Sequence, residues 1–254
     1  MDRAELQELL KTKPPATAAA SLSILLYGPP GAGKTYFAGT AADHPKTSPV
    51  FWIDIEGGTR TIADKTDIDV FECRSVEDLK KAGNTLEKSP GVYKCKVIDS
   101  LSELQKLDMT KIMRTAKMKN DNIDEEVPSP REWHKSQLHI RDVVRFFRDL
   151  PGHTIFITHS SDKENDAGIT NTMPSLPGKL AAEIAGFVDI VGFISAKPKT
   201  VMNKETKKQE KRIVRTILFE SNGTHIAKDR TDKLRFIDSE SPTVPMLWDA
   251  IYNN

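Results

Sequence analysis

Cysteine, net charge and long apolar runs are all scarce in this chain, and each scarcity excludes a class of protein. The 254 residues include two cysteines, Cys73 and Cys95, whose separation fits neither a disulfide framework nor a metal-binding motif. No apolar stretch approaches the roughly twenty residues of a membrane-spanning helix, and the N-terminus lacks the apolar core of a signal peptide. We therefore expect a soluble protein of a reducing cytoplasm, without a membrane partner or a structural metal.

Charge is nearly balanced along the chain. The 37 basic side chains exceed the 36 acidic ones by one, so the formal net charge is +1. A protein coated in cations attracts nucleic acid over its whole surface, whereas here any contact with nucleic acid has to be local. Motifs, rather than bulk charge, therefore have to identify the function.

Strand-like and helix-like patterns alternate along the sequence. Apolar runs typical of buried strands occupy residues 23–27, 50–55, 93–98 and 154–158. Helical patterns lie between them, polar stretches at 117–130 and 160–178 are expected to be loops, and the chain is strand-rich from residue 187 onwards. This order predicts an α/β fold: a mainly parallel central sheet flanked by helices, with antiparallel strands at its C-terminal edge.

The length fits one large domain with a short extension at each end. Residues 1–20 are predicted to form an amphipathic helix and a linker of small residues, an arm that docks on a neighbouring subunit or a frayed leader. Residues 21–235 are predicted to form the core, and residues 236–254 a C-terminal tail.

One short segment carries the most specific signal. An apolar run ends in Gly-Pro-Pro-Gly-Ala-Gly-Lys-Thr, the G-x-x-x-x-G-K-T pattern of the Walker A loop. The glycines let consecutive backbone N–H groups turn towards an anion, and the following helix presents its positive N-terminus. Lys34 is expected to reach the β- and γ-phosphates of ATP, and Thr35 to bind Mg²⁺. The predicted nucleotide-binding residues are Gly28, Pro29, Pro30, Gly31, Ala32, Gly33, Lys34, Thr35 and Tyr36.

Two carboxylates follow predicted strands, where P-loop hydrolases place the groups that organise Mg²⁺ and water. Asp99 ends an apolar strand and is the natural Walker B aspartate, a second candidate metal ligand. Ser100 follows it, whereas AAA+ motors usually place their catalytic glutamate there. Glu56 ends an earlier strand and is predicted to orient the attacking water instead.

The same strand ends resemble those of RecA-type recombinases. The run Phe-Trp-Ile-Asp-Ile-Glu, ending at Glu56, is similar to the strand that ends in the RecA catalytic glutamate. Asp99 followed by Ser100 is similar to the RecA Walker B. His159 ends a run similar to the strand whose last residue senses the γ-phosphate, although RecA itself has glutamine there.

Further along the chain, Ala-Lys-Asp-Arg resembles the paired basic residues that reach the γ-phosphate of a neighbouring subunit. Over residues 20–235 the chain resembles the short RecA-core ATPases of tailed phages, which are grouped with single-strand annealing and recombination proteins, although it lacks the separate C-terminal domain of RecA. The resemblance implies a RecA-like P-loop NTPase core, ATP and Mg²⁺, and an oligomer or filament with shared active sites. It also implies single-stranded DNA and a single-strand-binding protein as partners, in the cytoplasm of a bacterial host. The residues to which it assigns catalytic roles are Lys34, Glu56, Asp99, His159, Lys228 and Arg230.

Three segments are candidates for binding DNA. In RecA cores the loops after the third and fourth strands hold single strands, and the corresponding segments here are 111–133 and 160–179. Trp133 offers base stacking unless it is a core residue, while acidic residues at 121–126 repel phosphates unless they point away. A further basic run, either a solvated hairpin or a patch that contacts the DNA backbone, contains Lys197, Lys199, Lys204, Lys207, Lys208, Lys211, Arg212 and Arg215, opposed by Glu205 and Glu210.

Other functions remain open on the sequence. The Gly-Pro-Pro-Gly sequence is common in the phosphate-binding loops of AAA+ loaders and remodellers. Ser100 after Asp99, and the lack of room for a helical lid domain, argue against an AAA+ loader or remodeller. A small-molecule kinase needs a mobile arginine-rich lid, and no such cluster occurs. A fourth candidate is a nucleotide switch that binds ATP without hydrolysing it. Only a measurement of hydrolysis distinguishes such a switch from an ATPase.

Overall fold

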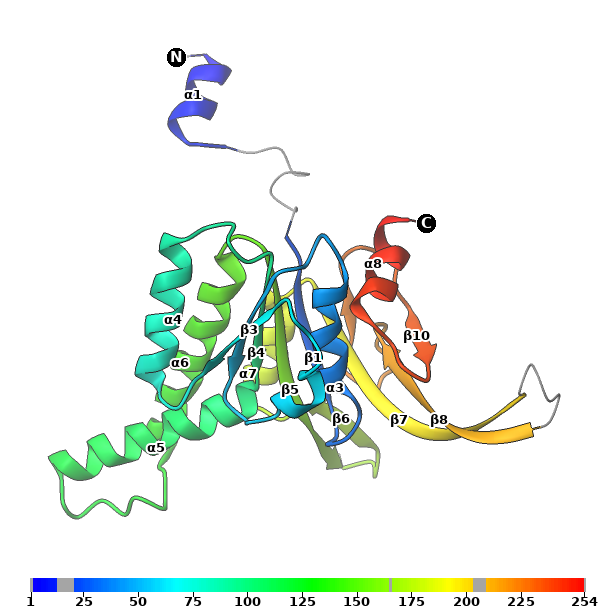
Figure 1. Ribbon diagram of the computed structural model, residues 1–254. Helices are drawn as coiled ribbons and strands as arrows, with labels where there is room; N and C mark the ends of the chain where they lie inside the picture. The colour runs from blue at the N-terminus through cyan, green and yellow to red at the C-terminus, as the bar shows by residue number, and fades with distance from the viewer. Residues whose placement is uncertain (1, 13–20, 165, 203–208, 254) are drawn as a thin grey trace.

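The computed structural model describes residues 2–12, 21–164, 166–202 and 209–253 (Figure 1). No helix within these ranges is both long and apolar enough to cross a membrane. The predicted linker at 13–20 falls outside the described residues, as do Lys204, Glu205, Lys207 and Lys208 of the basic run.

A ten-stranded sheet runs through the molecule in the order β10-β8-β7-β1-β5-β4-β2-β3, with β6 paired to β5 and β9 to β7. The strands are β1 (Ser23–Gly28), β2 (Val50–Asp54), β3 (Ile68–Glu72), β4 (Cys95–Asp99), β5 (His153–Glu164), β6 (Thr170–Pro174), β7 (Ile190–Met202), β8 (Gln209–Leu218), β9 (Lys228–Asp229) and β10 (Phe236–Ser239). The pairs among β1, β2, β3, β4, β5 and β7 are parallel, and those that involve β6, β8, β9 and β10 are antiparallel. The predicted α/β architecture is confirmed.

Helices cover both faces of this sheet (Figure 1). They are α1 (Arg3–Leu9), α3 (Lys34–Gly39), α4 (Val76–Lys88), α5 (Leu101–Lys119), α6 (Pro130–Asp149), α7 (Leu180–Phe187) and α8 (Val244–Tyr252), with 3₁₀ turns at Thr40–Asp43 and Thr59–Ile62. One core packs α3 and α8 against the sheet, and the other packs α4, α5, α6 and α7 against the opposite face. Helix α1 contributes no buried residue.

Strand β1 shows why the sheet is buried on both faces. Ile24 and Leu26 join the core beside α3 and α8, while Leu25 and Tyr27 join the core on the opposite side. Successive side chains of a strand point to opposite faces, so a continuous apolar run predicts a central strand between two helical layers. The carboxyl end of β1 is thereby fixed in the middle of the sheet, and the phosphate-binding loop follows it.

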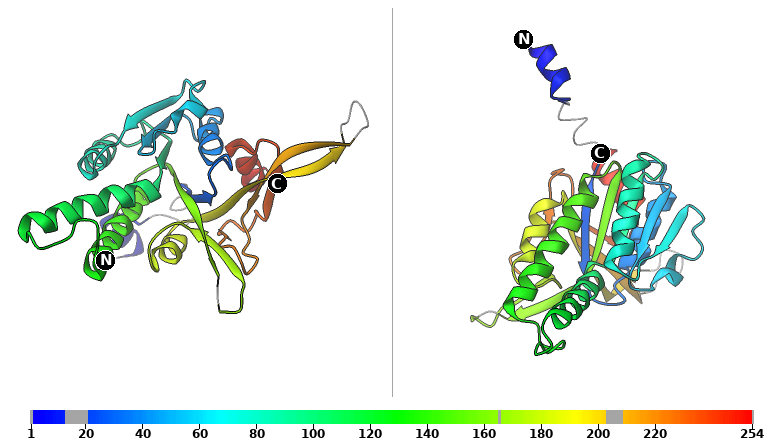
Figure 2. Two further views of the ribbon diagram at one scale, coloured as in Figure 1. Left: turned by 90° about the horizontal axis from the view of Figure 1, so that it is seen from below. Right: turned by 90° about the vertical axis from the view of Figure 1, so that its left-hand side faces the viewer.

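Two hairpins extend from the sheet (Figure 2). Residues 160–178 were predicted to be a loop, but β5 continues to Glu164 and pairs with β6, so this prediction was wrong for most of the segment. The β7–β8 hairpin pairs Phe193 with Leu218 and continues in register to Met202 and Gln209. We call the described part of this hairpin, residues 193–202 and 209–218, the basic arm.

The C-terminal residues are integrated with the core. Residues 236–254 were expected to form a tail, yet β10 pairs with β8, and α8 buries Leu247 and Trp248 against the sheet. Thr243 caps α8, and the Val244 N–H donates to Thr40 Oγ1 at 2.8 Å. The structure therefore shows no boundary at residue 235.

Candidate functional site

The loop between β1 and α3 has the geometry of an anion cradle. Gly31 and Gly33 have φ of +75° and +100°, a region that favours glycine. At Gly28, a Cβ atom would lie 2.2 Å from the Ile194 carbonyl oxygen, so this position admits only glycine. Lys34 Nζ donates to the carbonyls of Gly28 (2.9 Å) and Pro29 (3.0 Å). Burial lowers the pKa of Lys34, and the nearby Glu56 and Asp99 carboxylates oppose that shift.

The two predicted metal ligands meet beside this loop. Thr35 Oγ1 donates to Asp99 Oδ2 at 3.0 Å, although β5 lies between β1, which precedes the loop, and β4, which ends in Asp99. Asp99 is 2 % exposed, and burial raises the pKa of its carboxyl to about 7, against the hydrogen bond from Thr35. A hydroxyl and a carboxylate fit Mg²⁺, which commonly takes one or two protein oxygens and completes its shell with phosphate and water.

Glu56 reaches the site from the end of β2. The N–H groups of Ile55 and Glu56 donate to the Asp99 carbonyl at 2.7 and 3.2 Å. Asp54 Oδ1 accepts from the Gly57 N–H at 2.8 Å and fixes the turn that follows. The Glu56 backbone is therefore anchored on β4, and its partly exposed side chain lies among the residues around the loop.

Glu56 and His159 face each other across the sheet end. Glu56 Oε1 lies 3.4 Å from His159 Nε2, and His159 lies beside Gly28 in the pairing of β1 with β5. Within the described residues, His159 Nδ1 is buried without a hydrogen-bond partner. The structure thus brings together Lys34, Thr35, Glu56, Asp99 and His159, which come from four separate segments of the sequence.

Lys228 and Arg230 lie elsewhere. Strand β9 pairs with β7 at Ile190 and Val191, and Ile190 is level with the amino end of β1, away from the phosphate-binding loop. Lys228 Nζ donates to the Ala185 and Gly186 carbonyls, and Arg230 Nη2 donates to the Gly186 carbonyl at 2.8 Å. Within one chain, these two side chains hold the end of α7 and not the nucleotide site.

A cleft of about 460 Å³ opens over the loop, and Arg215 of β8 lines it. Arg215 Nε lies 2.9 Å from the position that a Cβ of Gly33 would take. From the sequence, Arg215 is only one member of a basic run, because no motif links its segment to the loop. The full lining is Pro30, Gly31, Gly33, Lys34, Thr35, Tyr36, Glu56, Thr61, His159, Arg215 and Ser241.

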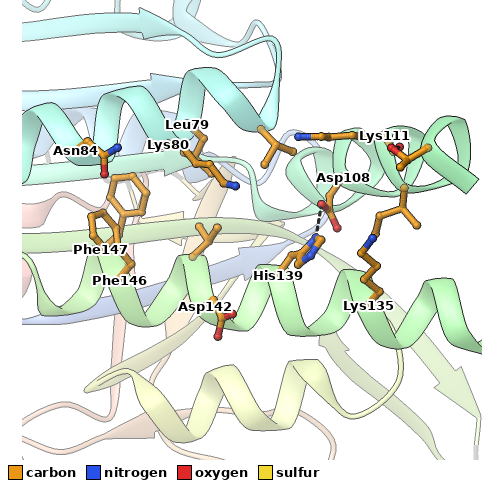
Figure 3. A pocket seen from close by; sticks show the side chains of 14 residues that line it. Leu79, Lys80, Asn84, Asp108, Lys111, Lys135, His139, Asp142, Phe146 and Phe147 are labelled. Atoms are coloured by element: carbon orange, nitrogen blue, oxygen red, sulfur yellow. Dashed lines mark hydrogen bonds and ion pairs between the residues drawn. The ribbon is translucent and has the colours of Figure 1, made fainter.

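A second cavity, of about 330 Å³, lies between α4, α5 and α6 (Figure 3). Leu79, Ile112 and Phe146 are among its apolar walls, and lysines stand at its rim. Asp108 is 2 % exposed, and its Oδ1 forms a hydrogen bond of 2.8 Å with His139 Nδ1. Its Oδ2 has no hydrogen-bond partner in the described part of the chain. No residue of the phosphate-binding loop lines this cavity, which we call the α4–α5–α6 groove.

The loop and the aspartate two strands away define a P-loop ATPase. Residues 20–231 match the model of a family described as an AAA domain, and the chain belongs to that family. No curated protein matches the chain.

Two solved structures are similar to this chain. A RadB recombinase has 14% sequence identity and a TM-score of 0.43, with 84% of each chain covered. A prototypical ATPase from the type III secretion system of pathogenic bacteria has 10% identity and a TM-score of 0.39, covering 69% of this chain and 52% of that chain.

Proposed function

We propose that this P-loop ATPase is a recombination or annealing protein of phage origin that binds single-stranded DNA in an ATP-dependent manner and acts as an oligomer or filament. The observation that carries the proposal is the approach of Glu56 to His159, because His159 continues directly into the β5–β6 hairpin. Glu56, which orients the attacking water, therefore contacts the residue that leads into the β5–β6 hairpin, a segment available to DNA.

The hydrolytic roles follow from the geometry of the cleft. Lys34 binds the β- and γ-phosphates, and Glu56 orients the water for attack on the γ-phosphorus. Thr35 and Asp99 hold Mg²⁺, which when bound neutralises charge that develops on the phosphate oxygens. His159 Nε2 contacts the γ-phosphate when ATP is bound and Glu56 when the γ-phosphate is gone. The position of the His159 side chain therefore differs between the ATP and ADP states.

The backbone contacts of His159 connect its position to the β5–β6 hairpin. The His159 N–H donates to Ser102 Oγ at 3.1 Å, and its carbonyl accepts from the Ser175 N–H at 2.8 Å, just after β6. A shift of His159 therefore moves both ends of the hairpin, which carries Lys163 and Asn171 on paired positions. We propose that this hairpin and the basic arm contact the DNA backbone, with affinity that falls as salt rises.

The decisive experiment is ATP hydrolysis with and without a single-stranded oligonucleotide. The proposal predicts stimulation by single strands well above that by duplex of equal nucleotide concentration, and loss of hydrolysis in Lys34→Ala. Equal rates with and without single strands would remove the DNA-dependent function and leave the ATPase.

Self-association is proposed through α1. Every residue of α1 is exposed, and Leu6 and Leu10 share one side with Arg3, at a spacing of three and four residues. The α4–α5–α6 groove offers apolar walls for leucines and, at Asp108, a buried carboxylate oxygen that fits a cation. We propose that α1 of one copy docks in this groove of the next copy.

Light scattering tests this contact. Leu6→Asp is expected to shift the full-length protein towards monomer at micromolar concentration. Gln7→Asp is the matched control, because it adds the same charge one residue away and is expected to leave the assembly intact. A wild-type protein that stays monomeric with ATP and DNA would refute the proposal, as would an assembly unchanged by Leu6→Asp.

In such an assembly Lys228 and Arg230 are proposed to act on the neighbour's nucleotide. They have to leave the α7 carbonyls to do so, which predicts that mixing Lys34→Ala with Lys228→Ala subunits restores part of the lost hydrolysis. A single-strand-binding protein is the further partner that the resemblance supports.

The family description supports a second candidate, an AAA-type loader or remodeller acting on a protein or a protein–DNA complex. Hydrolysis indifferent to DNA, together with rings in electron micrographs and stimulation by a protein partner, would favour it over the recombination function.

A further inference from the structure

Arg215 is a cation directed at the phosphate-binding loop from a distant strand. Its side chain crosses from β8 to Gly33, and its Nε lies 2.9 Å from where a Cβ of Gly33 would be. Gly33 caps α3, so its neighbourhood is the positive end of a helix that follows a loop of inward-turned N–H groups. Placing a guanidinium there is unfavourable for a nucleotide-free protein and favourable once an anion is bound.

The guanidinium is held in place but not neutralised. Its Nη1 donates to the Glu240 carbonyl at 2.6 Å, which fixes the orientation of the planar group. In the described part of the chain, no carboxylate forms an ion pair with Arg215, whereas Arg212 on the same strand pairs with Glu210 and Glu240. An arginine carries five N–H donors, so the remaining donors of Arg215 are available to a ligand in the cleft.

We infer that Arg215 binds the phosphate chain of the nucleotide held by its own chain and so ties the basic arm to the bound nucleotide. This inference rests on the proposed binding of ATP to the cleft. An arginine fork binds phosphate oxygens through two parallel N–H bonds, which a lysine at the same position cannot reproduce.

Because of its position in the basic arm, a contact between Arg215 and a phosphate restrains the arm. Arg215 pairs with Ala196 of β7 and with Ser239 of β10, so it lies at the base of the arm. Nine register pairs besides its own, from Phe193–Leu218 to Met202–Gln209, join the two strands of the arm. A phosphate that fixes Arg215 therefore restrains the base of a continuously paired ribbon, which links nucleotide binding to the segment proposed to contact DNA.

The test is a fluorescence titration with an N-methylanthraniloyl ATP, repeated with the matching ADP. Arg215→Ala is expected to weaken binding of both by at least about tenfold, and Arg215→Lys by less, because the charge remains while the fork is lost. Arg74→Ala removes the same charge from an exposed ion pair with Glu72, outside the cleft, and is expected to stay within about twofold of wild type. Arg215→Ala binding at the wild-type affinity would overturn the inference.

Hydrogen exchange separates a ligand contact from a purely structural role. ATP is expected to slow exchange of the described arm amides in the wild type and in Arg74→Ala, but not in Arg215→Ala. Equal protection in all three proteins would overturn the link to the arm. A wild-type protein that binds no ATP would instead refute the proposed nucleotide site itself, so the two failures are distinguishable.

Discussion

Two lysines are buried in the described part of the chain, at opposite ends of the parallel sheet, and their surroundings differ. Lys34 lies at the carboxyl end and donates to the carbonyls of Gly28 and Pro29. Lys96 lies at the amino end of the neighbouring strands and donates to the carbonyls of Leu150, Pro151 and Gly152 at 3.1, 2.6 and 2.9 Å. Both side chains are almost fully buried.

The surroundings decide which of these lysines acts on a ligand. Lys34 stands beside Glu56 and Asp99 and opens into a cleft, so a phosphate can replace its carbonyl partners. Lys96 closes the turn after α6, and burial lowers its pKa to about 8. A buried cation therefore indicates a binding site only where glycines and an open cleft leave room for an anion.

The largest predicted effect is the loss of catalysis in Lys34→Ala. Without the ammonium group, charge that develops on the phosphates is left without its nearest cation, and hydrolysis is expected to fall on the order of 10³-fold. Steady-state phosphate release measures it. Thermal unfolding is expected to change little, because a nucleotide-free Lys34 holds only loop carbonyls.

Glu56→Gln is expected to lower hydrolysis by roughly 10²-fold or more while leaving ATP binding intact, because the amide cannot accept the proton of the attacking water. Single-turnover hydrolysis and an ATP titration measure the two quantities separately. Normal turnover in this variant would remove Glu56 as the base and leave its contact with His159 without a catalytic role.

Lys96→Met is expected to show the opposite behaviour to Lys34→Ala. The three carbonyls at the end of α6 lose their shared donor, which is expected to lower the free energy of unfolding by about 2–4 kcal/mol. Hydrolysis per folded molecule is expected to stay unchanged. Chemical denaturation measures the stability, and a variant as stable as wild type would contradict the structural role of Lys96.

Asp99 predicts a pH dependence of stability at the nucleotide end of the sheet. Burial raises the pKa of its carboxyl from 3.8 to about 7, so the folded protein keeps a proton that the unfolded chain releases. This contribution to the stability of the nucleotide-free protein is fully present below pH 3.8 and is lost as the pH rises through about 7. Mg²⁺ needs the carboxylate, so Mg²⁺-dependent ATP affinity is expected to rise over the same window.

Denaturation across this pH range, with Asp99→Asn for comparison, isolates the effect. The amide cannot titrate, so the variant is expected to lose part of the decline in stability that the wild type shows. Parallel pH profiles of the two proteins would show that Asp99 titrates near its ordinary pKa.

The motifs at strand ends could be predicted from the sequence because each is local. Asp99 and Glu56 both follow apolar runs, and the carboxyl ends of parallel strands share one edge of a sheet, so their meeting follows from the pattern. The β6 strand was missed, because its Thr-Asn-Thr-Met-Pro sequence and its Gly-rich surroundings are typical of a loop. Pairing with the polar extension of β5 stabilises it instead.

Arg215 and helix α8 could not be predicted from the sequence, because their places depend on contacts between distant segments. Arg215 meets Gly33 only because β8 returns beside β7, and no local pattern predicts which cation of a basic run turns towards the loop. The predicted C-terminal tail contains α8, which is mostly apolar and completes the core beside α3, because no local pattern shows which part of the sheet a last helix covers.

The ratio of hydrolysis rates with and without single-stranded DNA, measured in wild type and in His159→Ala, tests whether DNA binding controls the nucleotide site. We expect a ratio well above one in the wild type and close to one in the variant, with ATP binding retained in both. A wild-type ratio of one would contradict the proposed function, and full stimulation of the variant would contradict the route through His159.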